Sequence, residues 1–214
     1  MRFSRPFRSS SASEAVGPLA RCSNGARGLV IFSFGLFTIA GQSLLFREFI
    51  TTFEGNDISV GIFFGSWFLW VGLGATLVYK VKAIGEMMLK HIELVFLSYV
   101  PVFALQLILI VQARRLAGIE SYALWSVRGI VFWSVVINSP VSVITGLLFP
   151  SACRWIRGSG GGAVSRVYII EAAGSFVGGI GATVLLGLGA SAARIFLVLA
   201  LIICVSVFAV RTAA

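Results

Sequence analysis

Six long apolar segments constrain this chain more than any other feature. They lie near residues 28–50, 58–79, 94–112, 127–149, 167–187 and 194–210. A helix needs roughly 20 residues to cross a hydrocarbon core about 30 Å thick. The segments lack the alternation of apolar and polar residues that membrane barrels show, and a helix satisfies its own backbone groups in lipid. The sequence therefore predicts an all-α, polytopic membrane bundle of about six transmembrane helices.

Composition also favours lipid surroundings. Charged residues make up 12% of the 214 residues and the mean hydropathy is +0.98, whereas an average soluble domain is about 25% charged. The net charge of +9 does not indicate nucleic-acid binding, because the basic residues lie between the apolar segments and not on one face of a polar domain. We expect contact with membrane lipids and no nucleic-acid partner.

The basic residues also predict an orientation. If the N-terminus is cytoplasmic, twelve of the 17 Lys and Arg residues lie inside and the other five lie outside. This asymmetry predicts that both termini are cytoplasmic. Residues 1–27 form a basic Ser/Arg-rich extension, and 28–214 form the six-helix transmembrane domain. The extension also fits an organellar transit peptide.

The sequence carries no recognisable catalytic motif. It has no phosphate-binding loop, zinc-protease motif or nucleophile elbow. The three cysteines have no metal-ligand spacing, and the single histidine, His91, excludes bis-histidine haem ligation by this chain alone. We expect no cofactor, no metal site and no catalytic activity from this chain alone.

The stretch LLFREFITTFEGND, at 44–57, concentrates polar residues between two apolar segments. Its candidate binding residues are Arg47, Glu48, Glu54, Asn56 and Asp57. Gly55 and Asn56 tolerate the left-handed conformation, and Asp57 is placed to cap the second helix. One interpretation is an outer hairpin with interface charges that snorkel or pair. The other is an outward-facing acidic and amide-rich site that binds a cation or a partner.

Three polar residues within the apolar segments are further candidates. Gln42 needs a partner on another helix, either as structural glue or as a substrate ligand. Asn138 belongs to a stripe of polar residues on one helical face, with Ser134, Ser142 and Thr145. Glu171 is expected to face this stripe or to pair with Arg166 or Arg154.

Small residues four positions apart predict close helix packing. The two pairs are Gly61 with Gly65, and Gly174 with Gly178.

Three stretches resemble the membrane domain of bacterial spermidine-synthase-like multi-pass proteins. They are GLFTIAGQSLLFREFITTFEGNDISVGIFFGSWFLWVGLGA at 35–75, GLLFPSACRW at 146–155 and RVYIIEAAGSFVGG at 166–179. The resemblance implies a multi-pass membrane domain in a bacterial cytoplasmic (inner) membrane. Members of that family often carry, after the helices, an aminopropyltransferase-like domain with a Gly-rich cofactor loop and catalytic aspartates. This sequence contains no such domain, so aminopropyl transfer is not expected of it.

Two functions follow as hypotheses. The first is a non-catalytic integral membrane subunit that anchors or organises soluble or membrane partners, in a larger enzyme or electron-transfer assembly. The alternative is a carrier for small molecules or cations, with polyamines suggested by the resemblance. Gln42, Asn138, Glu171 and the outer acids would line its path. An enzyme acting on a lipid or quinone has the least support, because no nucleophile is paired with a base.

Overall fold

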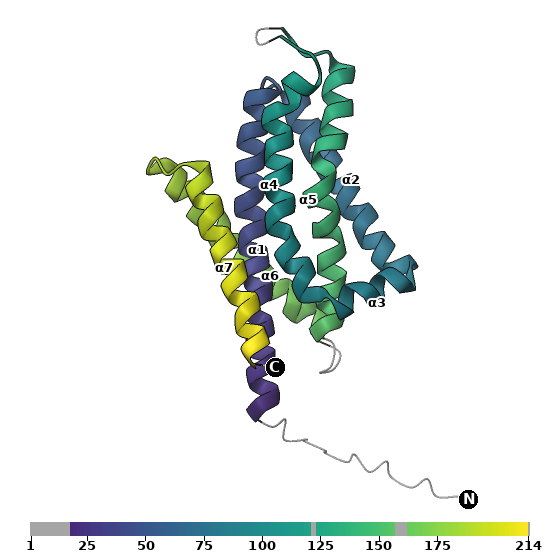
Figure 1. The fold of residues 1–214 in the computed structure, drawn as a ribbon, viewed down its shortest axis with the longest axis vertical. Helices are drawn as coiled ribbons and strands as arrows, with labels where there is room; N and C mark the ends of the chain where they lie inside the picture. The colour runs from purple at the N-terminus through teal and green to yellow at the C-terminus, as the bar shows by residue number, and fades with distance from the viewer. Residues whose placement is uncertain (1–17, 121–122, 157–161, 214) are drawn as a thin grey trace, which may run out of the picture.

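A computed structural model describes residues 18–120, 123–156 and 162–213 of the chain. All secondary structure in these ranges is helical, and six of the helices are long and apolar enough to cross a membrane. The all-α class and the six predicted spans are confirmed (Figure 1). The helices are α1 (Pro18–Thr52), α2 (Asp57–Lys80), α3 (Lys82–Lys90), α4 (Ile92–Leu116), α5 (Val127–Ile156), α6 (Ala163–Gly187) and α7 (Ala192–Ala213).

The first helix begins earlier than the sequence predicted. Residues 18–27, assigned to the N-terminal extension, already belong to α1, whose candidate span begins at Gly25. Pro18 suits a first helical position, since an N–H there has no intrahelical partner. The remainder of the predicted extension, 1–17, lies outside the described residues.

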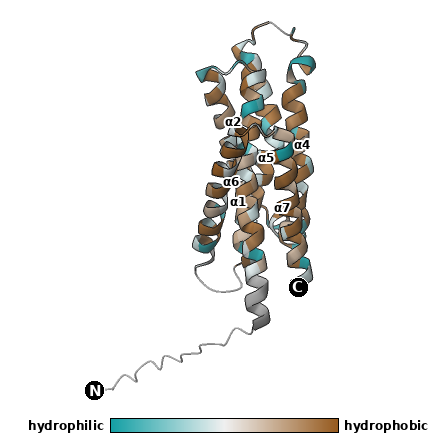
Figure 2. Ribbon diagram, turned by 90° about the vertical axis from the view of Figure 1, so that its left-hand side faces the viewer, coloured by the Kyte–Doolittle hydropathy of each residue, from teal (hydrophilic) through white to brown (hydrophobic). Residues whose placement is uncertain are grey.

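Helix α1 runs through the middle of the molecule and joins two groups of helices. It packs against α6 and α7 on one side and α4 on the other, while α5 packs against both α2 and α4. Figures 1 and 2 show α6 and α7 as a hairpin beside the other spans. The start of α1 and the end of α7 lie at the same end of the bundle, here named the termini end. The α1–α2 turn lies at the opposite end.

Glycines allow the closest helix contacts. A Cβ atom added at Gly174 of α6 would lie 2.9 Å from the Phe32 carbonyl carbon of α1, and one at Gly178 would lie 2.8 Å from the Leu36 Cα. The α2–α5 contact is built the same way, because a Cβ at Gly146 would lie 2.9 Å from the Val71 Cα. Only glycine permits backbones to approach this closely.

The predicted packing face at Gly61 and Gly65 is wrong. Both glycines are exposed, and a Cβ added at either would meet no atom within 4 Å. On α2 the close approach occurs at Gly74, where an added Cβ would lie 3.1 Å from the Leu147 N of α5. A spacing of four places two residues on one face of a helix, but it does not determine which face turns inward.

Aromatic side chains fill the contact between α1 and α4. The Phe37 ring lies edge-to-face with Tyr99 and with Phe103, at centroid distances of 5.2 and 5.4 Å. These three side chains are fully buried. Such pairs add a little stabilisation beyond the area they bury.

Helix α3 was not predicted from the sequence. It lies between two spans and has an amphipathic pattern, with Gly85 and Met88 buried while Lys82, Glu86 and Lys90 are exposed. Its nine residues are too few to cross a membrane, and such a helix suits the interface.

Candidate functional site

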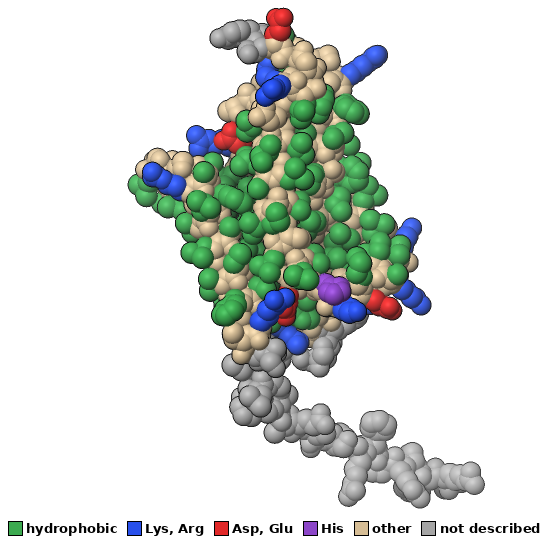
Figure 3. All heavy atoms as spheres, viewed as in Figure 1, with side chains coloured by type: hydrophobic (Ala, Val, Ile, Leu, Met, Phe, Trp, Pro, Cys, Tyr) green, Lys and Arg blue, Asp and Glu red, His purple; other side chains and the backbone are tan. Residues whose placement is uncertain are grey.

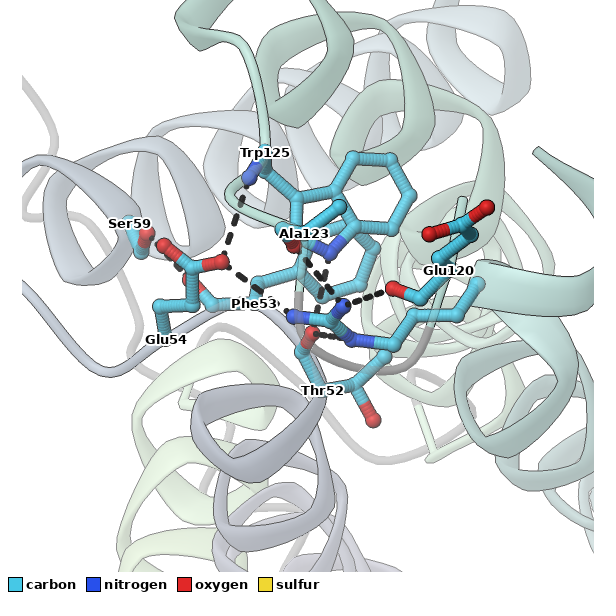
Figure 4. A network of polar contacts seen from close by, with 8 residues as sticks. Thr52, Phe53, Glu54, Ser59, Glu120, Ala123 and Trp125 are labelled. Atoms are coloured by element: carbon cyan, nitrogen blue, oxygen red, sulfur yellow. Dashed lines mark hydrogen bonds and ion pairs between the residues drawn. The ribbon is translucent and has the colours of Figure 1, made fainter. Parts of the chain in front are cut away.

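At the end of the bundle that carries the α1–α2 turn, Arg114 of α4 contacts the end of α1, the α1–α2 turn and the α4–α5 connection; Figure 4 labels the residues that it contacts. Its Nε donates to the Thr52 carbonyl at 3.1 Å, and its Nη1 donates to the carbonyls of Glu120 and Ala123 at 3.1 and 3.0 Å. Its Nη2 forms an ion pair with Glu54 Oε1 at 3.2 Å. One guanidinium therefore ties the end of α1 to the connection that leads into α5.

Trp125 completes this cluster. Its backbone N–H donates to Glu54 Oε1 at 3.1 Å, and its indole N–H donates to the Thr52 carbonyl at 3.0 Å. The ring stacks at a tilt against Phe53, with centroids 4.6 Å apart. Thr52, Glu54, Arg114 and Trp125, together called the Arg114 cluster, therefore hold one another in place.

The α1–α2 turn differs in detail from the prediction. Glu54 and Gly55 adopt the left-handed conformation, with φ of 68° and 43°, whereas Asn56 is extended. Asn56 is the N-cap of α2, because its Oδ1 accepts from the Ser59 N–H at 2.8 Å. The prediction that Asp57 caps the helix is therefore wrong by one residue. Asp57 lies in the first turn, where its charge complements the helix dipole.

The other polar residues of the hairpin remain outside this cluster. Arg47, Asn56 and Asp57 are exposed and Glu48 is half-buried. Among the described residues the ion pairs are Arg114 with Glu54 and Arg211 with Glu93, so Arg47 and Glu48 do not pair. No group of three His, Cys, Asp or Glu side chains in the described part of the chain is placed to hold a metal ion.

A second polar cluster lies buried among α2, α4 and α5. Asn138 Nδ2 donates to Ser66 Oγ at 2.7 Å and to the Phe63 carbonyl at 3.2 Å, and its Oδ1 accepts from Gln106 Nε2 at 3.2 Å. Gln106 and Asn138 are fully buried. The two amides therefore satisfy each other and join three helices, as buried polar groups in a membrane require.

Pro140 lies beside this cluster and changes the hydrogen bonding of α5. A proline has no N–H, so the carbonyl four residues earlier lacks its usual helical donor. That carbonyl belongs to Val136, and Ser139 Oγ donates to it at 2.8 Å. The N–H of Val141 donates to Gln106 Oε1 at 3.0 Å. Side chains thus replace the regular helical bonding around the proline.

Two further hydroxyls of the predicted polar stripe are buried. Ser134 Oγ and Ser142 Oγ have no hydrogen-bond partner in the part of the chain that the structure describes, and both residues are fully buried. The fourth member, Thr145, exchanges a 2.8 Å hydrogen bond with the Tyr99 hydroxyl. The stripe therefore faces the interior, with Asn138 and Thr145 hydrogen-bonded and the hydroxyls of Ser134 and Ser142 without a partner among the described residues.

The partner predicted for Gln42 and the ion pairs predicted for Glu171 are absent from the described residues. Gln42 is half-buried and has no hydrogen-bond partner in the described ranges. Glu171 Oε1 accepts from Ser175 Oγ at 3.2 Å, on its own helix, and makes no ion pair there with Arg166 or Arg154. Helix α6 packs mainly on α1 and also contacts α5, while the hydrogen-bond partners of the α5 stripe belong to α2 and α4.

Three residues at the centre of these clusters were not predicted. Gln106 is the amide nearest the middle of the predicted span 94–112, which also ends on Gln112, and Tyr99 lies seven residues before Gln106 on the same helical face. That pattern was a usable signal. The sequence signal at Arg114 was weaker, because its contacts are to the backbone carbonyls of Thr52 and Glu120, which only the folded chain brings to it.

Comparisons of the chain with protein-family models, curated proteins and solved structures found no match. The resemblance to spermidine-synthase-like membrane domains therefore stays a prediction.

Proposed function

We propose that this chain is an integral membrane subunit that anchors or organises partner proteins in a bacterial inner membrane, with both termini cytoplasmic. The observation that carries the proposal is the closed bonding of the buried amides. Gln106 and Asn138 direct their hydrogen bonds to each other, to Ser66 and to backbone groups. This use of the polar interior favours a rigid structural bundle over one that binds substrate.

The exposed part of the α1–α2 hairpin supports the proposal as a docking surface. Arg47, Asn56 and Asp57 are exposed there, and Ile58 beside them is 54% exposed. The Arg114 cluster holds the turn that carries them. A fixed turn with charged and apolar groups suits a partner interface, because little ordering entropy is lost on binding.

Purification of the tagged chain in mild detergent tests the proposal. We expect a partner at a fixed molar ratio, measured by quantitative mass spectrometry, and we expect Arg47→Glu to lower that ratio. Arg128→Glu is the matched control, because Arg128 is also exposed but lies at the start of α5. A chain that purifies alone as a monomer or dimer would contradict the proposal.

The second candidate is a carrier of small molecules or cations. The observation in its favour is the pair of buried, unpartnered hydroxyls on Ser134 and Ser142, on either side of the Pro140 irregularity. Uptake of a labelled polyamine into proteoliposomes tests it. Uptake above that of protein-free liposomes, and a loss of that uptake in Glu171→Gln, would support a carrier. Uptake equal to that of empty liposomes would contradict it.

A further inference from the structure

A cavity of about 510 Å³ opens at the termini end of the bundle. Its lining residues come from four helices and are Val78, Tyr79, Lys82, Glu86, Phe149, Pro150, Cys153, Arg154 and Val164. The volume falls in the range of about 300–1,000 Å³ that small-molecule sites occupy. Neither the Arg114 cluster nor the buried amides contribute to it.

The cavity lies where three candidate spans reach their ends. Val78 and Tyr79 are among the last residues of the α2 span, Arg154 lies two residues before the end of the α5 span, and Val164 begins the α6 span. Helix α3, which is too short to cross, supplies Lys82 and Glu86. The site is therefore at the level where hydrocarbon meets the polar headgroups.

The walls of the cavity are mostly apolar. Val78, Phe149, Pro150 and Val164 contribute aliphatic and aromatic surface, and the Tyr79 side chain beside them is 87% exposed. Tyrosine is enriched at this depth because its ring is apolar and its hydroxyl is polar. A ligand that fills the cavity must therefore have an apolar part as well as a charged one.

Three charged groups line the same cavity without pairing with each other. Lys82, Glu86 and Arg154 form no ion pair among the described residues. The Arg154 guanidinium lies directly over Gly85, so that a Cβ at residue 85 would collide with its Nη1. The missing side chain at Gly85 thus leaves room for Arg154 beside α3.

We propose that this cavity binds one membrane phospholipid with a phosphoethanolamine headgroup. The phosphate diester, with one negative charge, contacts Arg154 and Lys82 through charge-assisted hydrogen bonds. The primary ammonium of the headgroup donates to Glu86. The glycerol and upper acyl chains contact the apolar wall formed by Phe149 and Val164. The proposal does not depend on whether the chain is a subunit or a carrier.

The arrangement of charge and apolar surface selects this occupant. A free phosphate leaves the apolar walls in contact with water, which is unfavourable. A phosphoglycerol headgroup leaves Glu86 without a cation. A phosphocholine headgroup carries a quaternary ammonium, which has no N–H to donate to the Glu86 carboxylate.

Native mass spectrometry of the full chain tests the proposal. The protein is reconstituted in bilayers that contain equal amounts of phosphatidylethanolamine, phosphatidylcholine and phosphatidylglycerol with the same acyl chains, then released and weighed. We expect one retained phosphatidylethanolamine. In Arg154→Gln we expect its retention to fall about tenfold, the loss of one charge-assisted hydrogen bond. Glu86→Gln should abolish the preference over phosphatidylcholine.

Two further variants separate binding at this cavity from a general effect of charge. Arg166→Gln removes an exposed cation of α6 that does not line the cavity, and it should leave retention unchanged. Gly85→Ala keeps every charge but displaces Arg154, and it should weaken retention. Equal retention of the three lipids, a preference for phosphatidylglycerol, or an equal loss in Arg166→Gln would overturn the proposal.

Discussion

The two ends of the bundle use charged side chains in different ways. Figure 3 shows Lys, Arg, Asp and Glu side chains gathered at both ends, with hydrophobic side chains between them. At the end that carries the α1–α2 turn, Arg114 and Glu54 form an ion pair, and their side chains are 23% and 25% exposed. Both also hydrogen-bond to backbone groups. At the termini end, Arg211 pairs with Glu93, but Lys82, Glu86 and Arg154 surround a cavity and form no ion pair among the described residues.

The difference arises from how the helices are connected. Arg114 donates to the Thr52 carbonyl at the end of α1 and to the carbonyls of Glu120 and Ala123 in the α4–α5 connection. At the termini end, α3 forms its own backbone hydrogen bonds and offers side chains instead. Arg114 therefore stabilises the fold through backbone carbonyls near its end of the bundle. Beside α3, which replaces a loop, Lys82, Glu86 and Arg154 remain available to a ligand.

Arg114→Gln gives the largest expected effect. The variant loses the ion pair to Glu54 and hydrogen bonds to three carbonyls, so we expect the free energy of unfolding in detergent to fall by about 3 kcal/mol. Arg154→Gln is the matched control at the termini end, with a change below about 0.5 kcal/mol. Equal losses in the two variants would remove the contrast between the ends.

Glu54→Gln should cost less than Arg114→Gln. The amide oxygen still accepts from the Trp125 N–H, but the ion pair with Arg114 is lost, so we expect a decrease of about 1 kcal/mol in the free energy of unfolding. The same measurement on Glu86→Gln should show no decrease. Destabilisation by Glu86→Gln would mean that the acid at the termini end is also structural.

Asn56→Ala tests which residue caps α2. Loss of the side-chain bond to Ser59 N should lower the free energy of unfolding by about 1 kcal/mol. Asp57→Ala should lower it by only about 0.3 kcal/mol, since a charge near the helix N-terminus contributes less than a cap. The reverse order, measured by the same unfolding titration, would restore Asp57 as the cap.

Arg47→Gln should have the smallest effect. Arg47 is exposed and makes no ion pair among the described residues. We expect its unfolding free energy to change by less than about 0.5 kcal/mol. A larger decrease would show that the hairpin has a structural charge besides Glu54.

The sequence predicted the spans well because their signal is long and local. Each apolar run extends over several turns, and lipid leaves few alternatives to a helix. Helix α3 gave a weaker signal, since a short amphipathic segment with charged residues is also typical of a connector.

The sequence did not predict which residues contact one another across different helices. The spacing of Gly61 and Gly65 is as good as that of Gly174 and Gly178, yet only the second pair faces a neighbour. Glu171 was expected to face the α5 stripe or to pair with Arg166 or Arg154, but among the described residues its side chain accepts from Ser175 of its own helix and forms no ion pair. Which helices become neighbours depends on the whole bundle, and no local pattern in one segment specifies it.

The central place of α1 has a consequence for assembly during synthesis. Its Ser33 hydroxyl bonds Ser206 of α7 at 2.6 Å, and Gly35 lies against the backbone of Glu171 in α6. Helices α6 and α7 are translated after α1. Helix α1 therefore has to keep its small-residue face unoccupied in the bilayer until α6 and α7 have been translated and inserted.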